Sequence, residues 1–370
     1  MARPTVAEIS LSALQQNFQT LLDLLPRSTG ILGVVKANGY GHGAVPVARA
    51  LEAAGARMLG VATVEEGVEL RRAGIRVPLV VLGGVDPPQA GEAHAHGLSA
   101  VLFDRGQAGY LAREAGKTGR PFPVHVKVDT GMGRLGILPG EVAGLLRDLP
   151  REPGIRLEGW MTHLSSADGP AAGDRVDTLE QLRVFSEGLP AMRSAFGKDV
   201  AVHALNSAGV LGYREEPFDL VRPGISLYGC SPLPEDAGVS LRPVMRIVTR
   251  IVSLKELPDG HGVSYNRRYR CSGARSVAVV PVGYADGYRR GLTGQARVAV
   301  AGRTAPVAGT ICMDHTVIDV TGIPGVGIGT PVEVMGGDSL SACEMARLCG
   351  TIPYEILTQV GSRIPRVVVG

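Results

Sequence analysis

The stretch ILGVVKANGYGHGAVPVARALEAAGARMLGVAT, residues 31–63, holds two short β-branched apolar runs separated by a segment with helical character. Apolar runs of this length, bounded by Gly-containing turns, are typical of buried strands. Two such strands joined by a helix form a βαβ unit, the building block of a parallel sheet. The stretch therefore predicts an α/β architecture.

The same alternation continues from residue 31 to about residue 229. Its apolar runs read ILGVVKAN, MLGVAT, PLVVLGG, SAVLF, PVHVKVDTG, LEGWMTHL, AVHALNS and LVRPGISLYG. Eight βα units predict a (β/α)8 TIM barrel, with functional side chains at the carboxyl ends of the strands. The alternative is a doubly wound open sheet, but the GxGxxG loop that such a sheet usually carries does not follow the first run.

After the segment SPLPEDAG the pattern changes to runs that alternate with a period of two, separated by Gly-containing turns. These runs predict a second, mainly β domain. We therefore expect a barrel over residues 11–237 and a mainly β domain over residues 238–370. Residues 4–10 resemble a short strand, which we expect to join the sheet of the second domain. The later runs read RIVTRIVSL, SVAVVPVGY, RVAVAGRTAPVAG, HTVIDV and PVEVMGG.

The amino-acid composition and charge of the chain exclude several classes of protein function. The chain has 38 basic and 35 acidic residues, a net charge of +3 at pH 7, and no dense basic run, so nucleic acid and anionic membranes are not indicated as partners. Neither a signal peptide nor an apolar run of bilayer-spanning length is apparent, which favours a cytoplasmic protein. The five cysteines lack metal-site spacing, so we expect reduced thiols and no metal. A small-molecule enzyme fits best.

The search for a nucleophilic amine is short, because the chain has only five lysines. Lys36 ends the first apolar run and precedes ANGYGHG. We expect its side chain at the catalytic face of the barrel, beside a loop that permits close approach. An exposed lysine at a strand end is the alternative interpretation. The other lysines are Lys117, Lys127, Lys198 and Lys255.

Seven segments, VVKANGYGHG, DTGMGRLG, NSAG, VRPGISLYG, GVSYNRRY, PVGYADGY and ICMD, occur in this order over nearly the whole chain. They resemble the alanine racemase family, whose members join a barrel that binds pyridoxal 5'-phosphate (PLP) to a C-terminal β domain. The resemblance implies an isomerase that interconverts L-alanine and D-alanine and supplies D-alanine for cell-wall peptidoglycan. It also implies a homodimer with shared active sites.

In this resemblance, Lys36 matches the lysine that forms the Schiff base with PLP. Desolvation and nearby cations would give its amine the depressed pKa that this role requires. PLP withdraws electrons from Cα, and racemisation then needs a base on each face. Lys36 would be one base, and Tyr265 of the partner subunit matches the other. A phenol is a poor base at neutral pH, so the site must favour its phenolate.

Arg222, at the end of the eighth run, matches the arginine that faces the ring nitrogen of PLP. A guanidinium cannot accept the ring proton, so it would keep that nitrogen unprotonated and limit side reactions. A decarboxylase of the same fold type would be expected to carry an acid there. An ion pair with Asp219 is the structural alternative. The residues that match a hydrogen-bond chain around this arginine are His163 and His203.

The loops after the seventh and eighth runs are where barrel enzymes often hold a phosphate. Ser207 can donate its hydroxyl there, while Gly224 and Ile225 can offer backbone N–H groups. Asn206 and Ser207 could equally be a helix cap. The tyrosines that the resemblance adds to this cradle are Tyr40 and Tyr354.

Two residues match contacts to the substrate carboxylate: Arg134 by its charge and Met313 by its backbone N–H. Lys127 lies on the fifth run. Because side chains alternate between the two faces of a strand, it is expected on the same face as His125 and Asp129. In several family members the matching lysine is carbamylated, which turns a cation into an anion able to orient the arginine. We expect this modification because an unmodified Lys127 beside Arg134 would form a like-charge pair.

The segment around ICMD departs from the family. Thr310 stands where an arginine commonly lines the entrance, which leaves entrance geometry and substrate breadth open. Asp314 remains and is expected to support the same channel. Tyr284, Arg290 and Ile352 could line it or be ordinary packing.

Three alternatives stay open beside an alanine racemase. The first is a broad-range or serine-preferring racemase of the same fold. The second is a non-catalytic PLP-binding protein, against which the opposing base Tyr265 argues. The third is a barrel unrelated to PLP.

Overall fold

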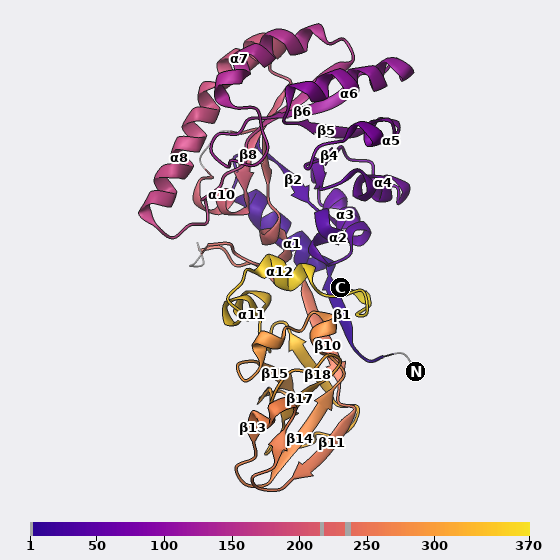
Figure 1. Ribbon diagram of the computed structural model, residues 1–370, viewed down its shortest axis with the longest axis vertical. Coiled ribbons are helices and arrows are strands. Elements are labelled where there is room, and N and C mark those ends of the chain that lie inside the picture. Colours follow the sequence, from indigo (N-terminus) through magenta and orange to yellow (C-terminus); the bar gives the residue numbers. More distant parts are fainter. Residues whose placement is uncertain (1–2, 215–217, 234–237) are drawn as a thin grey trace.

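The computed structural model of the chain describes residues 3–214, 218–233 and 238–370. Figure 1 shows two parts stacked along the long axis, a barrel surrounded by helices and a domain built mainly of strands. Eight parallel strands in the described chain close the barrel. The predicted fold, a TIM barrel followed by a mainly β domain, is confirmed. The barrel strands are β2 (Gly30–Val34), β3 (Met58–Val61), β4 (Leu79–Val81), β5 (Leu98–Leu102), β6 (Phe122–Lys127), β7 (Ile155–Met161), β8 (Ala201–Asn206) and β9 (Leu220–Arg222).

Helices cover the outside of the barrel, and α4 (Val64–Arg72) illustrates why they form. The Thr63 side chain accepts a hydrogen bond from the Glu66 N–H, which caps the first turn. Acidic residues lie in that turn and Arg71 and Arg72 in the last, matching the helix dipole. The other main helices are α1 (Leu11–Asp23), α3 (Ala44–Ala53), α5 (Ala90–Ala95), α6 (Arg105–Thr118), α7 (Pro139–Asp148), α8 (Ala172–Glu187), α9 (Leu189–Phe196) and α10 (Ser207–Gly212).

The barrel interior is a packed core. Strands β2, β4, β5 and β6 are buried at every position, as expected for parallel strands covered on both faces. This leaves the carboxyl ends of the strands as the place where a ligand can enter. Across residues 3–214, 218–233 and 238–370, every helix is too short or too polar to span a bilayer.

The β domain contains a sheet with the strand order β16-β15-β18-β10-β1-β19. The N-terminal strand β1 (Val6–Ser10) pairs antiparallel with β10 and parallel with β19, so the start of the chain lies in this sheet. The boundary expected near residue 237 falls on residues 234–237, outside the described residues. The remaining strands and two helices are β10 (Met245–Arg250), β11 (Ser253–Leu257), β12 (Gly262–Val263), β13 (Tyr269–Arg270), β14 (Arg275–Val280), β15 (Arg297–Val300), β16 (Arg303–Pro306), β17 (Thr316–Asp319), β18 (Pro331–Met335), β19 (Arg366–Val369), α11 (Ala342–Leu348) and α12 (Pro353–Thr358).

The run RIVTRIVSL, which the sequence presents as one strand, forms two. The first part belongs to β10 and the last to β11, and these strands lie in different sheets. The Ile251 N–H bonds to the Thr330 oxygen, whereas the next N–H, of Val252, bonds to the Val279 oxygen. The chain therefore changes partners between two adjacent residues, which apolar alternation does not reveal.

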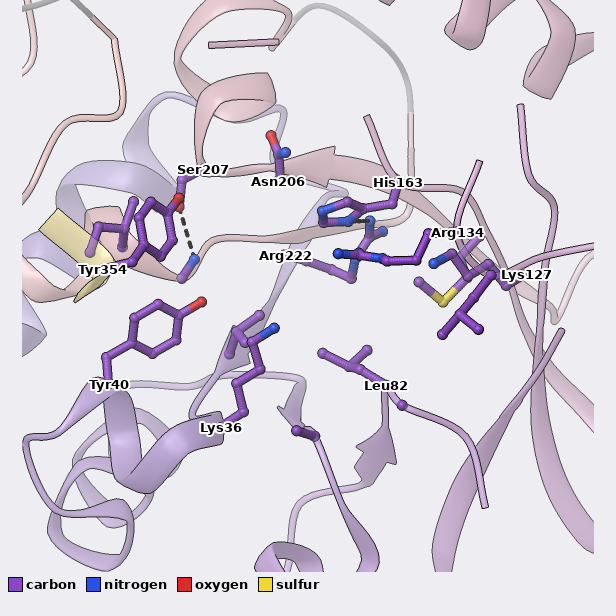
Figure 2. Close-up of a pocket in the computed structure, with 17 residues that line it drawn as sticks. Lys36, Tyr40, Leu82, Lys127, Arg134, His163, Asn206, Ser207, Arg222 and Tyr354 are labelled. Atoms are coloured by element: carbon purple, nitrogen blue, oxygen red, sulfur yellow. Dashed lines mark hydrogen bonds between the residues drawn. The ribbon is translucent and has the colours of Figure 1, made fainter. Parts of the chain in front are cut away.

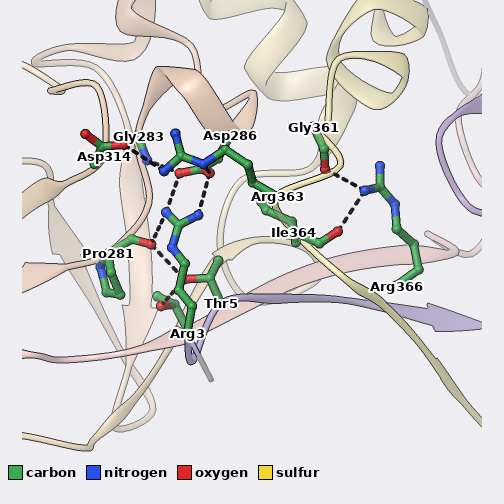
Figure 3. Close-up of polar contacts among 11 residues, drawn as sticks. Arg3, Thr5, Pro281, Gly283, Asp286, Asp314, Gly361, Arg363, Ile364 and Arg366 are labelled. Carbon is green, nitrogen blue, oxygen red and sulfur yellow. Dashed lines mark hydrogen bonds and ion pairs between the residues drawn. The ribbon is translucent and has the colours of Figure 1, made fainter. Parts of the chain in front are cut away.

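A cluster of ion pairs around the buried Asp286 ties the N-terminus to the loops of the β domain (Figure 3). Arg3 donates to both carboxylate oxygens of Asp286, at 2.6 and 2.5 Å, and the Asp286 side chain is fully buried. The Gly283 N–H also donates to Asp286, and Arg363 bridges Asp286 and Asp314 at 3.3 and 2.7 Å. Burial would raise the pKa of Asp286, but these partners hold it below its usual value. The cluster thereby fixes the loops around Tyr284 and Met313.

Candidate active site

A cavity of about 280 Å³ opens at the carboxyl ends of the barrel strands (Figure 2). Side chains from several strands converge on it, together with Tyr354 from α12 of the β domain. The wall thus combines cations, hydroxyl groups and a few apolar side chains. The expected site residues that line it are Lys36, Tyr40, Lys127, Arg134, His163, Asn206, Ser207, Arg222, Gly224, Ile225 and Tyr354.

Lys36 stands at the start of a left-handed turn. The four residues 37–40 have φ values of 53, 54, 59 and 51°, and three of them are not glycine. Each non-glycine residue in this conformation costs about 1–2 kcal/mol. The carboxylate of Glu66 compensates by accepting from the N–H groups of Ala37 and Ala62, both at 2.7 Å. Glu66 therefore clamps the strained turn that presents Lys36 to the cavity.

The environment of Lys36 suits a nucleophilic amine. Burial lowers the pKa of Lys36 below its usual value, the charge of Arg134 lowers it further, and the carboxylate of Glu66 opposes both. A lowered pKa increases the fraction of neutral amine at a given pH, and only the neutral amine attacks a carbonyl.

Arg222 carries a buried charge without a carboxylate partner among the residues that the structure describes. Its guanidinium is 3% exposed and donates to the backbone oxygens of Thr162, His203 and Ala204, at 2.6, 2.8 and 2.9 Å. It also contacts Nδ1 of His203 at 3.1 Å. Figure 2 shows its second imidazole contact, with Nδ1 of His163 at 3.3 Å. Burial lowers the pKa of Arg222 to about 9, which leaves it charged at neutral pH.

The alternative partner of this arginine, Asp219, lies elsewhere. Its carboxylate accepts from the Val202 N–H at 2.8 Å and lies 3.4 Å from the guanidinium of Arg193. The interpretation of Arg222 as one half of an ion pair with Asp219 is therefore wrong, and its positive charge is available to the cavity.

Ser207 and Gly224 form a small polar cradle. Ser207 Oγ accepts from the N–H of Gly224 at 2.9 Å and from that of Ser226 at 3.3 Å. A Cβ at Gly224 would lie 2.2 Å from the hydroxyl of Tyr40, so only glycine fits there. Asn206 lines the cavity and also caps α10, because its side-chain oxygen accepts from the Gly209 N–H at 2.9 Å.

Lys127, at the end of β6, is 4% exposed, and within the described chain its ammonium makes neither a hydrogen bond nor an ion pair. Burial lowers its pKa to about 8, and the charges of Arg134 and Arg222 add to the effect. The loop that carries Arg134 is held by Asp129, whose carboxylate accepts the N–H groups of residues 131–134 at 2.8–3.1 Å. Around Lys127, like charges therefore outnumber the one opposing charge, that of Asp129.

Apart from Tyr354, the residues expected from the β domain do not reach this cavity within one chain. Tyr265, Met313, Tyr284 and Ile352 are 65, 52, 40 and 56% exposed, and none of them lines the cavity. Large apolar side chains that gather in exposed loops often mark an interaction surface. Arg290 is exposed and Asp314 is half-buried, bound to Arg363.

Thr310 does not line an entrance. It is 2% exposed, and its hydroxyl donates to the backbone oxygen of Tyr265 at 3.0 Å. The backbone oxygen of Thr310 accepts a hydrogen bond from the hydroxyl of Ser264 at 2.5 Å. Ser264, Asn266 and Arg267 all have positive φ, so Thr310 braces a strained turn around Tyr265 from beneath.

Sequence reasoning missed several contributors to the site. Glu66 is one, although its place after the cap Thr63 marked the start of a helix. The Leu82 and Met161 side chains form apolar walls at strand ends. His125 was noted only as a neighbour of Lys127, and no local pattern shows that it contacts His203.

Comparisons with known proteins agree with this geometry. Residues 9–232 match the family model described as alanine racemase, N-terminal domain, and residues 244–368 match alanine racemase, C-terminal domain. The chain is 43% identical to the alanine racemase of Geobacter sulfurreducens, over 99% of this chain and 97% of that protein. It is 41% identical to that of Desulfovibrio desulfuricans, over 99% and 98%.

Solved structures show the same likeness. The alanine racemase of Streptomyces lavendulae superposes with a TM-score of 0.91 at 34% identity, covering 100% of this chain and 98% of that one. The biosynthetic alanine racemase of Pseudomonas aeruginosa superposes with a TM-score of 0.88 at 33% identity, covering 100% of both chains.

Proposed function

The chain belongs to the alanine racemase family, and from that premise we propose that it interconverts L-alanine and D-alanine with PLP bound at Lys36. The observation that carries the proposal is the pairing, in one cavity, of a desolvated amine at Lys36 with the charged guanidinium of Arg222, which has only neutral acceptors around it. PLP, when bound, would supply an electron sink for the electrons left at Cα.

The donors of the cavity fit such a group. Lys36 would hold the aldehyde carbon and Arg222 the ring nitrogen. The phosphate would lie at Ser207 and at the N–H groups of Gly224 and Ile225, with the Gly224 N–H exchanging its bond to Ser207 for one to the phosphate. The missing Cβ of Gly224 lets the Tyr40 hydroxyl come close to this cradle. The residues that would complete this cradle are Asn206, Tyr354 and His163.

We assign proton transfer to two groups. The Lys36 amine would accept or return the Cα proton on one face, and Tyr265 of the partner subunit would do so on the other. The exposure of Tyr265 and Met313 supports a homodimer in which the β domain of one chain covers the cavity of the other. The Met313 N–H and Arg134 would bind the substrate carboxylate, with Tyr284 and Asp314 in support.

Borohydride trapping tests the cofactor assignment. Reduction of the purified protein, followed by digestion and peptide mapping, should place a pyridoxyl label on the peptide that contains Lys36. Lys127 serves as an internal control, because it lies in the same cavity and is also desolvated. A label on Lys127, or no label, would refute the assignment.

Carbamylation of Lys127 is a further part of the proposal. The neutral amine is the form that reacts with CO₂, and a pKa of about 8 makes this form more abundant than for an exposed lysine. The resulting anion would lie between Arg134 and Arg222 and remove the like-charge contacts. Labelled bicarbonate should give a carbamate carbon signal that is lost in Lys127→Ala. A wild-type spectrum without that signal would contradict the modification.

A comparison of the turnover of L-alanine, L-serine and L-lysine distinguishes an alanine racemase from a broad-range or serine-preferring racemase of the same fold. We expect L-alanine to be preferred and its product, D-alanine, to serve peptidoglycan synthesis in the cytoplasm. Equal or faster turnover of serine would favour the serine-preferring alternative.

A further inference from the structure

Two imidazoles stand in line behind the guanidinium of Arg222. His203 Nδ1 lies 3.1 Å from Arg222 Nη1, and His203 Nε2 lies 2.8 Å from Nδ1 of His125. The two rings meet edge to face at 71°, and both side chains are fully buried. His125 sits on β6 and does not line the cavity, so its hydrogen-bonded connection to the site runs through His203 and Arg222.

The direction of each hydrogen bond in this chain follows from Arg222. A guanidinium has donors and no acceptor, so Nδ1 of His203 must accept, and the ring hydrogen of His203 is on Nε2. That N–H points at His125, whose Nδ1 must accept in turn. His125 therefore carries its hydrogen on Nε2. Burial, followed by the charge of Arg222, lowers the pKa of His125 to about 3, so the ring is neutral at physiological pH.

His125 is kept in the barrel core although half of its hydrogen-bonding capacity is unused. In the described chain its Nε2 is buried without a partner, which is unfavourable. The neighbouring strand makes room for the ring, because a Cβ at Gly159 would lie only 1.9 Å from His125 Nδ1. A core histidine retained for packing would be replaceable by an apolar residue without this loss. The hydrogen bond to His203 is what distinguishes His125 from an apolar residue of the same size at this position.

We propose that His125 is a positioning residue that fixes the tautomer of His203 and thereby the place of the Arg222 guanidinium. The proposal rests on the proposed function for its catalytic meaning, because Arg222 is there assigned to the ring nitrogen of PLP. Without the acceptor at His125, only the contact with Arg222 still favours hydrogen on Nε2 of His203, and the tautomer with hydrogen on Nδ1 becomes more populated. Two donors would then face each other at His203 and Arg222, and the guanidinium would move.

Two substitutions test the proposal. In His125→Asn the side-chain oxygen occupies the place of Nδ1 and still accepts, whereas His125→Leu fills a similar volume without an acceptor. Histidine-selective ¹⁵N NMR of the cofactor-free protein should show His203 with hydrogen on Nε2 in the wild type and in His125→Asn. His125→Leu should show a mixture of tautomers. A wild-type His203 with hydrogen on Nδ1 overturns the proposal, whether or not either variant folds.

The second readout is the ratio of transamination to racemisation in the PLP-loaded enzyme. We expect it to rise about tenfold in His125→Leu, the order of one lost hydrogen bond, and to return toward the wild-type value in His125→Asn. A purely structural role would lower the unfolding temperature and leave this ratio unchanged, which would refute positioning. If borohydride labels no lysine, the proposed function fails, yet the NMR result still decides the tautomer of His203.

Discussion

The barrel mouth and the exposed face of the β domain are built in opposite ways. At the barrel mouth, Lys127 and Arg222 are buried and Lys36 is half-buried, and this burial already lowers the pKa values of all three. On the β domain, Tyr265 and Met313 are exposed in loops. The difference teaches that one chain by itself prepares the half of the site that we propose for the cofactor. The opposing half has the character of a surface that another chain covers.

The two regions nevertheless share one device. Each presents its proposed proton-transfer group on a strained turn, residues 37–40 after Lys36 and residues 264–267 around Tyr265. Each turn is braced from another part of the chain, the first by the carboxylate of Glu66 and the second by the hydroxyl of Thr310. The brace in the barrel is charged, and that in the β domain is neutral. Charged hydrogen bonds are the stronger, so the two braces should differ in effect.

The largest expected effect tests whether the two halves belong to different chains. Lys36→Ala and Tyr265→Phe should each lower racemisation by about 10²- to 10⁴-fold, the contribution of a positioned acid or base. Mixing the two inactive proteins should restore activity, because a mixed dimer holds one site with both groups intact. Assays before and after subunit exchange measure this. Absence of recovery in heterodimers proven by differential tagging would contradict shared sites.

The next effect concerns the cluster that holds the exposed loops. Asp286→Asn should lower the free energy of unfolding by about 2–3 kcal/mol, because the buried side chain loses its charge-assisted hydrogen bonds to Arg3 and its ion pair with Arg363. Urea unfolding at pH 7 measures the change. The matched control is Arg297→Ala, which breaks an exposed pair with Glu344 in the same domain and should cost no more than about 1 kcal/mol.

The same cluster has a defined pH dependence. The folded pKa of Asp286 is depressed, so its contribution to stability is present above the unfolded value near 4 and is lost as the pH falls through the folded value. The stability difference between wild type and Asp286→Asn should therefore shrink on acidification below about pH 4. A difference that stays constant down to the acid transition would show that the charge of Asp286 is not what stabilises the loops.

The sequence predicted the barrel well because buried parallel strands leave continuous apolar runs, and all eight runs correspond to strands β2–β9. It predicted Lys36 and Arg222 at strand ends for the same reason. It could not predict the partner change at Ile251 and Val252, nor the left-handed turn at 37–40. It also could not show that Arg222 bonds to carbonyl oxygens and not to Asp219. These features depend on contacts between segments far apart in the chain.

A smaller effect should follow from weakening the hydrogen bonds by which the Glu66 carboxylate holds the turn after Lys36. Glu66→Gln keeps one acceptor oxygen, so either Ala37 or Ala62 loses its partner, and PLP incorporation into the apo protein should slow by about tenfold. Since the Glu66 charge raises the pKa of Lys36, its removal should also extend incorporation to lower pH. Borohydride trapping across a pH series measures both. Glu65→Gln, one residue away on the same helix, is the control, and an identical profile in the two variants would contradict the brace.

The smallest effect should come from removing the hydrogen bond by which the Thr310 hydroxyl holds the turn around Tyr265. Thr310→Val keeps the buried shape but removes the hydroxyl that donates to the Tyr265 oxygen, a loss of about 1 kcal/mol. We assign the Cα proton of L-alanine to Tyr265 and that of D-alanine to Lys36, so solvent exchange at Cα should slow more from L-alanine than from D-alanine, by up to about fivefold. Net turnover cannot report this asymmetry, because L-alanine and D-alanine are enantiomers of equal free energy and the equilibrium constant is therefore one. Thr310→Ser retains the donor and should behave as the wild type. Equal slowing from both isomers in Thr310→Val would mean that the turn does not depend on this hydroxyl to aim Tyr265, and that the exposed half of the site is held by its packing alone.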